Sequence, residues 1–207
     1  MTIHYPALPA FTVSLSRPAS GDVSDPENTA FLFFGEEARL LAGTRLFSVA
    51  HGDAVLLSPE TPAYLYPERG EEGVLRLLLP TALLRTLAPH VLLTSATGCA
   101  VFATEEELSA PLAAIETGDA SALFSLLYAL TRALTVTEAR EAPLPRCLRL
   151  ALAALSEYGE RLADAKALAL RCGVSETTLF RAFRSHLSLT PKKYLRLAES
   201  ARARRLP

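Results

Sequence analysis

The feature that most constrains the fold is a short glycine-containing turn between two amphipathic helical segments in the last third of the chain. A segment from about residue 162 to residue 172 carries apolar residues at helical spacing and is followed by Gly173 and Val174. Glycine tolerates the positive φ that a sharp turn requires. Ser175 is then well suited to cap a helix over Glu176–Leu187. A helix, a short turn and a capped helix form a helix-turn-helix, whose second helix enters the major groove of DNA.

The helix predicted over residues 176–187 has two faces. One face is apolar and is expected to lie in the core: Leu179, Ala182, Phe183 and His186. The other face carries the residues expected to contact DNA: Thr177, Phe180, Arg181 and Arg184. Arginine can pair bidentately with guanine or bind a phosphate, and threonine can contact a thymine methyl group or a phosphate. Phe180 has two alternatives, a thymine methyl group or a neighbouring helix that covers its ring.

Helices are also predicted on both sides of this unit. The preceding helix covers Arg146–Tyr158 and ends at Gly159. The following helix begins at Pro191, a residue suited to the first helical position. It is strongly basic and is expected to contact phosphates through Lys192, Lys193 and Arg196.

The charge of the chain is divided between its two parts. The net charge of −1 combines +8 from Arg146 onward, with 13 Lys/Arg against 5 Asp/Glu, and −9 before it, with 8 against 17. Such asymmetry favours a nucleic-acid or membrane partner for the basic part. A basic face that only contacts solvent would give the same numbers.

The first 80 residues are typical of antiparallel β-structure. Short apolar runs alternate with clusters of Gly, Pro, Asp and Asn, the pattern of a sandwich or barrel. The predicted strands are Thr12–Ser16, Ala30–Phe34, Ala38–Ala42, Thr44–Ala50, Ala54–Ser58, Ala63–Tyr66 and Val74–Leu79.

Two helices are predicted after these strands, over Thr104–Glu116 and from Asp119 to about Leu134. The second has a leucine stripe, formed by Leu123, Leu127, Leu130 and Leu134. The stripe either packs against the sheet of its own chain or forms the seam of a homodimer. Thr135–Pro145 is polar and proline-containing, as in an interdomain linker. The predicted domains are therefore 1–134 and 146–207, joined by 135–145.

Several classes of protein are disfavoured. The chain begins without a signal-peptide pattern and has no run of about 18 apolar residues, so a cytoplasmic protein with no membrane partner is expected. Its three cysteines have no CxxC spacing and are expected to be reduced and to bind no metal. The four histidines are scattered without a His-x-His, and no catalytic motif occurs, so no cofactor and no enzymatic activity are expected.

Residues 168–206 (LALRCGVSETTLFRAFRSHLSLTPKKYLRLAESARARRL) share a frame with a known family. The frame is Leu-Ala-x3-Gly-Val-Ser-x3-Leu-x-Arg-x-Phe, then Thr-Pro-x2-Tyr-Leu and Ala-Arg. It resembles the first helix-turn-helix and linker helix of the AraC-type transcription regulators. The resemblance implies base contacts from Thr177, Phe180 and Arg181, with Arg184 nearer the DNA backbone.

The upstream part also looks like that family, mainly by domain order and by His51–Tyr66 (HGDAVLLSPETPAYLY). The implied fold is α+β: an N-terminal cupin-like antiparallel β-barrel with following helices, then a small all-α helix-turn-helix domain. The implied function is transcription regulation, as an activator and homodimer on double-stranded DNA. Small apolar residues in the barrel would suit a small hydrophobic effector, although core packing explains them equally well. Some cupins are metal-dependent enzymes, which is the less favoured alternative.

The sequence departs from the family in three places. Ser188 stands where a loop glycine is usual, and Glu199 stands where an arginine is common. The family normally has a second helix-turn-helix after this helix, and the sequence ends at Pro207. The chain is then either a shortened regulator or one with a single reading helix per chain. A further alternative is a regulator that does not bind DNA and acts by forming mixed dimers with a full-length relative.

Overall fold

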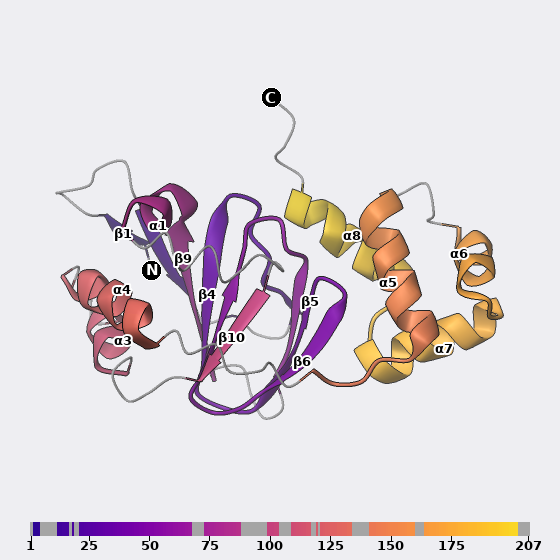
Figure 1. Ribbon diagram of the computed structural model, residues 1–207, viewed down its shortest axis with the longest axis horizontal. Coiled ribbons are helices and arrows are strands. Elements are labelled where there is room, and N and C mark those ends of the chain that lie inside the picture. The colour runs from indigo at the N-terminus through magenta and orange to yellow at the C-terminus, as the bar shows by residue number, and fades with distance from the viewer. Residues whose placement is uncertain are drawn as a thin grey trace.

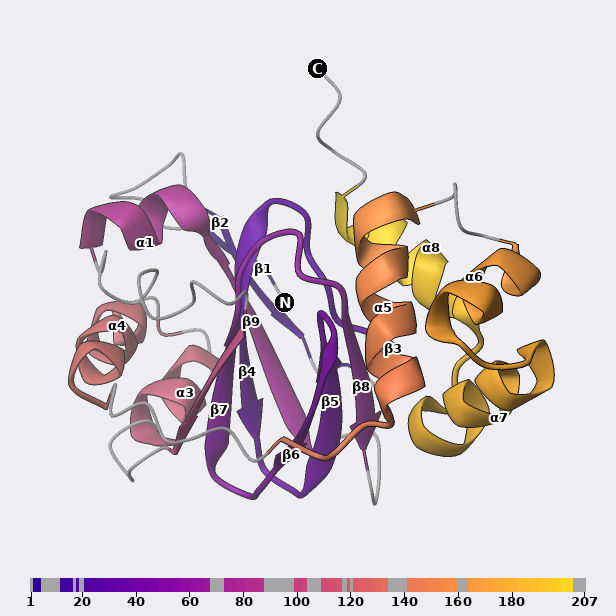
Figure 2. The ribbon, with the colours of Figure 1, turned by 45° about the vertical axis from the view of Figure 1, so that its right-hand side comes forward.

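The chain folds into two antiparallel sheets between two groups of helices, an α+β fold (Figures 1 and 2). The computed structural model describes residues 2–4, 12–16, 18, 21–67, 73–87, 99–103, 109–116, 119, 121–133, 141–159 and 164–202. The predicted fold class is confirmed.

The larger sheet has six strands in the order β1-β2-β9-β4-β7-β10. In chain order these strands are β1 (Thr2–His4), β2 (Thr12–Ser16), β4 (Asn28–Phe34), β7 (Asp53–Leu57), β9 (Val74–Pro80) and β10 (Cys99–Ala103). The smaller sheet has four strands in the order β3-β8-β5-β6. They are β3 (Gly21–Asp22), β5 (Ala38–Ala42), β6 (Arg45–Val49) and β8 (Ala63–Pro67).

The two sheets share one apolar core. Alternate residues of each strand enter it, because successive side chains of a strand point to opposite faces. From the smaller sheet, Leu65, Leu40 and Phe47 are paired across three strands and lie in this core. Leu32 and Val55 face them from the larger sheet. The described strands pair within each sheet only, so hydrogen bonding there forms a two-sheet sandwich rather than the single closed barrel that the resemblance implied.

The outer face of the smaller sheet is apolar as well. Its central row is Tyr64, Leu41 and Leu46, which are paired across β8, β5 and β6. Both leucines are buried, and they belong to a second core cluster that includes residues of the C-terminal helices. A sheet that is apolar on both faces requires cover on both. The C-terminal helices provide it on this side.

Two groups of helices flank the sheets on opposite sides (Figure 2). On the side of the larger sheet lie α1 (Thr81–Leu87), α3 (Ser109–Glu116) and α4 (Ala122–Ala133). On the other side lie α5 (Arg146–Tyr158), α6 (Ala165–Cys172), α7 (Glu176–Leu187) and α8 (Pro191–Arg202). Helix α5 packs against each of the other three.

The seven predicted strands all form, with ends within two residues of the prediction. The pattern missed β1, β3, β10 and α1. Helices α5 and α7 have the predicted bounds, and α8 begins at Pro191 as predicted. Helix α6 begins at Ala165, after its N-cap Asp164 and later than the predicted 162. Helix α3 is described from Ser109, and its predicted start at Thr104 lies outside the described residues.

The end of the predicted linker is bound to the smaller sheet. The Ala142 N–H donates to the Leu46 carbonyl at 2.8 Å, and Glu141 forms an antiparallel bridge with Phe47. Residues 135–140 lie outside the described residues. Residues 141–145 therefore run along β6 and lead directly into α5, so this part of the predicted linker is not free to adjust.

The predicted leucine stripe of α4 differs from its observed faces. Leu123 is only 1% exposed and packs inside its own chain, with Ala122, Leu126 and Ala129. For Leu123 this burial matches the alternative of packing within its own chain, and the dimer seam of the stripe stays a prediction. The side chains of Leu127 and Leu130, and the whole of Leu134, lie outside the described residues. The exposed large residues of α4 are Phe124 and Tyr128, at 47% and 64%.

The two phenylalanines of α7 allow a test of which helix face anchors the fold. Phe183 is fully buried and Phe180 is 37% exposed. We expect Phe183→Ala to lower the free energy of unfolding by about 3–5 kcal/mol, because it leaves a cavity. The matched change Phe180→Ala should cost less than about 1 kcal/mol. Urea unfolding monitored by circular dichroism measures both, and equal losses would contradict the assignment of the two faces.

Candidate nucleic-acid interface

The predicted helix-turn-helix forms with its expected turn chemistry. Gly173 adopts the left-handed conformation at φ 68° and ψ 31°, and its N–H donates to backbone carbonyls of α6. The Ser175 hydroxyl accepts from the Thr178 N–H at 3.1 Å, which caps α7. A left-handed glycine followed by a capped helix fixes the angle between α6 and α7. The predictions for Gly173 and Ser175 are confirmed.

Helix α7 is anchored by one face and exposed on the other. Leu179, Phe183 and Leu187 are fully buried against the neighbouring helices. Ala182 and His186, also predicted for the core, are only half-buried. The residues predicted to contact DNA are all exposed: Thr177, Phe180, Arg181 and Arg184.

These four residues come together around one shallow hollow. With Glu176, Ser185 and Thr190 they line a concave surface of about 760 Å³ between α7 and the start of α8. Two guanidinium groups and one carboxylate therefore share this surface, which leaves it positively charged. Such a surface is suited to an anionic or hydrogen-bonding partner such as a base edge or a phosphate.

Ser188 ends α7 in a left-handed conformation with φ 47°, a conformation usually taken by glycine. Its N–H still donates to the Arg184 carbonyl at 3.1 Å. Thr190 then caps α8 by accepting from the Lys193 N–H at 3.1 Å. The turn geometry is thus kept without glycine, at the conformational cost of a left-handed non-glycine residue.

The three basic residues predicted to contact phosphates do not share one environment. All three are exposed on α8, but only Lys192 and Arg196 are without a contact to the smaller sheet among those described. Lys193 reaches the smaller sheet, where its Nζ donates to the Tyr64 hydroxyl at 2.9 Å and lies 4.8 Å from the centre of that ring. Lys193 therefore has a partner within its own chain.

Tyr194 is a residue whose role the sequence did not reveal. It is fully buried, and its hydroxyl donates to the Gly43 carbonyl at 2.9 Å and lies 2.8 Å from the Ser156 Oγ. It thereby joins the β5–β6 turn, α5 and α8. The sequence held only an indirect sign of this contact. In β8 the tyrosines Tyr64 and Tyr66 lie on the face opposite Ala63 and Leu65, which indicates a strand that is covered on both faces.

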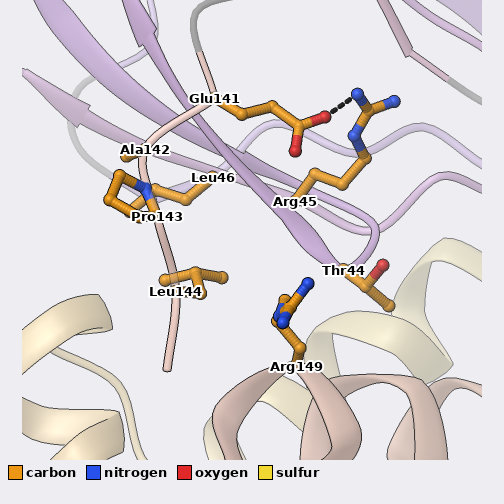
Figure 3. Close-up of a pocket in the computed structure, with 8 residues that line it drawn as sticks. All are labelled: Thr44, Arg45, Leu46, Glu141, Ala142, Pro143, Leu144 and Arg149. Carbon is orange, nitrogen blue, oxygen red and sulfur yellow. Dashed lines mark ion pairs between the residues drawn. The ribbon is translucent and has the colours of Figure 1, made fainter. Parts of the chain in front are cut away.

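A second hollow lies where the helical part, α5 to α8, meets the smaller sheet (Figure 3). Its volume is about 530 Å³, and it is lined by Thr44, Arg45, Leu46, Glu141, Ala142, Pro143, Leu144 and Arg149. Arg45 is ion-paired with Glu141, and Arg149 extends from α5 toward the β5–β6 turn (Figure 3). Part of the lining is apolar, and its charged side chains are two arginines and one glutamate, which gives a net charge of +1.

Within the described ranges, no three His, Cys, Asp or Glu side chains converge as metal ligands would. His51 lies in a turn, and its Nδ1 is 2.7 Å from the Gly35 carbonyl oxygen. Burial raises the pKa of the Cys172 thiol, which keeps it protonated and unreactive. None of the described helices has the length and apolar character to cross a bilayer.

No family profile matches the sequence, and no curated relative does. Solved structures with a similar arrangement include the AraC-like transcriptional activator CuxR, at 12% identity and a TM-score of 0.46, over 94% of this chain and 77% of that one. ToxT from Vibrio cholerae O395 is 12% identical with a TM-score of 0.45, over 93% and 79%. An unsaturated fatty acid bound ToxT from Vibrio cholerae strain SCE256 is 11% identical with a TM-score of 0.38, over 89% and 94%. These values transfer no residue role and no ligand to this chain.

Proposed function

We propose that the chain is a DNA-binding transcription regulator of the AraC type that reads the major groove with α7. The resemblance further implies that it is an activator. The observation that carries the proposal is the exposed face of α7, where Thr177, Phe180, Arg181 and Arg184 surround one hollow beside a fully buried face. The buried face holds the helix, and the exposed face is free to contact base edges.

Arg181 and Arg184 supply different kinds of contact in this proposal. Arg181 reads guanine through its O6 and N7 acceptors, and Arg184 lies nearer the backbone. Lys192 and Arg196, exposed on α8, bind phosphates and set affinity without sequence preference. Phe180 is 37% exposed, enough to contact a thymine methyl group.

Arg181→Ala tests the reading role of α7. We expect it to cost about 1–3 kcal/mol on a preferred site selected from random DNA and to relax selectivity at one base pair. The control is Arg85→Ala, which removes the same charge from α1 on the opposite side of the sandwich (Figure 2). Band shifts at constant salt measure both. If Arg181→Ala kept affinity and base preference, α7 would not be the reader. Wild-type protein that retards no DNA would instead favour action through a mixed dimer.

We further propose that two chains act together through α4. The described residues hold one reading helix per chain, and one such helix makes too few contacts for tight specific binding. Joining two chains raises the effective concentration of the second reading helix. Phe124 and Tyr128, one helical turn apart and exposed, are the residues proposed for the seam.

The double variant Phe124→Asp and Tyr128→Asp should convert the dimer to monomers, because the seam would then bury unpaired charge. Sedimentation at micromolar concentration measures the change. Ala82→Asp, on the exposed side of α1, adds charge outside the seam and should leave the dimer intact. A monomeric wild type, or a double variant that stays dimeric, contradicts the α4 seam.

Ligand control is proposed for the hollow of Figure 3. Its apolar wall of Leu46, Pro143 and Leu144, together with the guanidinium of Arg149, favours an amphipathic acid over a purely hydrophobic effector. Its volume of about 530 Å³ lies in the range of ordinary ligand sites. A ligand there would contact the β5–β6 turn, residues 141–144 and α5 together.

Decanoate and decanol, which differ only in the charged head group, test this site. Decanoate should raise the melting temperature, because binding stabilises the folded state, whereas decanol should have little effect. Arg149→Ala should abolish the decanoate shift, and Arg85→Ala should retain it. Equal shifts of the melting temperature from both compounds, or an unchanged decanoate shift in Arg149→Ala, would contradict a ligand site in this hollow.

A further inference from the structure

The helical part and the smaller sheet pack against each other through an apolar cluster. The Tyr64, Leu41 and Leu46 row of the sheet packs into the same cluster as Leu148 and Leu152 of α5 and Leu195 and Leu197 of α8. Figure 2 shows α5 and α8 alongside this sheet. The two parts therefore have a common apolar core rather than separate cores joined by a tether.

Polar contacts fix the relative position of these elements. The Tyr194 hydroxyl lies between the Gly43 carbonyl and the Ser156 Oγ, at 2.9 and 2.8 Å, while its ring is fully buried. Hydrogen bonds are directional, whereas apolar packing alone permits sliding. One side chain thus sets the distance of α5 and α8 from the β5–β6 turn.

Lys193 adds a second contact beside the first. Its Nζ donates to the Tyr64 hydroxyl at 2.9 Å and lies over the Tyr64 ring, a cation–π geometry. Tyr64 packs against Tyr66 with ring centres 4.9 Å apart. Burial raises the pKa of Tyr66 far above its usual value, so this part of the contact stays uncharged. We call the set of Gly43, Tyr64, Ser156, Lys193 and Tyr194 the Tyr194 junction.

The chain that leads into α5 is held at the same place. The Ala142 N–H donates to the Leu46 carbonyl, and Glu141 is ion-paired with Arg45. Both ends of the helical part, the start of α5 and the body of α8, are therefore bound to β5, β6 and β8. Helix α7 packs against α5 and α6, so its position follows from that of the helices that are bound to the sheet.

We infer that the Tyr194 junction positions the reading helix, so that Tyr194, Tyr64 and Lys193 control DNA binding without contacting DNA. This inference rests on the proposed function of α7. It changes the role expected for Lys193 from phosphate contact to positioning residue. It also means that the sheet domain, not a flexible linker, sets where α7 lies.

The salt dependence of DNA binding separates positioning from phosphate contact at two adjacent lysines. Lys192→Ala should weaken binding to all DNA and reduce the slope of log affinity against log salt by about one. Lys193→Ala should weaken specific binding about tenfold and leave that slope unchanged. Tyr64→Phe, which removes only the acceptor of Lys193, should reproduce the Lys193→Ala effect. A slope reduced by about one in Lys193→Ala overturns the inference.

A distance measurement tests the junction without DNA, so its outcome is separate from that of the proposed function. Spin labels are placed at Arg85→Cys and Ser185→Cys in a full-length chain whose native cysteines are replaced by alanine, and the labelled chain is diluted with an excess of unlabelled, cysteine-free chain so that only distances within one chain are measured. We expect one narrow distance distribution, broadened by Tyr194→Phe combined with Lys193→Ala and unchanged by Lys192→Ala. Tyr194→Phe keeps the buried ring, and circular dichroism verifies that the variants are folded. A broad distribution in the parent chain, or no broadening in the folded double variant, overturns the junction.

Discussion

The structure depends on the burial of the outer face of the four-stranded sheet. Strands β5, β6 and β8 carry apolar side chains on both faces, so one face enters the sandwich core and the other cannot be left in water. Leu41 and Leu46 on that outer face are buried in the cluster that they form with the C-terminal helices. The same burial that completes the sheet therefore attaches the helical part to it.

A continuous set of contacts connects this attachment to α7, the helix proposed to read DNA. Helix α8 is bound to the sheet through Tyr194, and α5 contacts both α8 and α7. Helix α7 in turn is held by Leu179, Phe183 and Leu187, which leaves Arg181 on its outer side. The inference that the Tyr194 junction positions α7 implies that a change at the β5–β6 turn reaches α7 along these contacts. The hollow beside Arg149 adjoins the same turn, which suits it to a ligand that acts on this path.

Local patterns predicted most elements but not every face. The strand bounds and the Gly173 turn follow from alternation and turn chemistry, which involve neighbouring residues only. The two-residue β3 is too short to show an alternation. Helix α4 (ALFSLLYALTRA) is apolar almost all around, so its spacing did not decide which side is buried. Packing chose the side of Leu123 and Leu126 and left Phe124 and Tyr128 exposed.

The sequence by itself determined the helix-turn-helix, its caps and the exposed face with Thr177, Arg181 and Arg184. These depend on residues within a few positions of one another. Only the tertiary structure decided the partners of Lys193 and Tyr194, which lie 129 and 151 residues away along the chain at Tyr64 and Gly43. A basic residue next to a tyrosine at the start of a helix has the same local pattern whether it binds a phosphate or a sheet. The burial of the apolar sheet face by α8 decided between these two roles, because it brought Lys193 and Tyr194 within hydrogen-bonding distance of Tyr64 and Gly43.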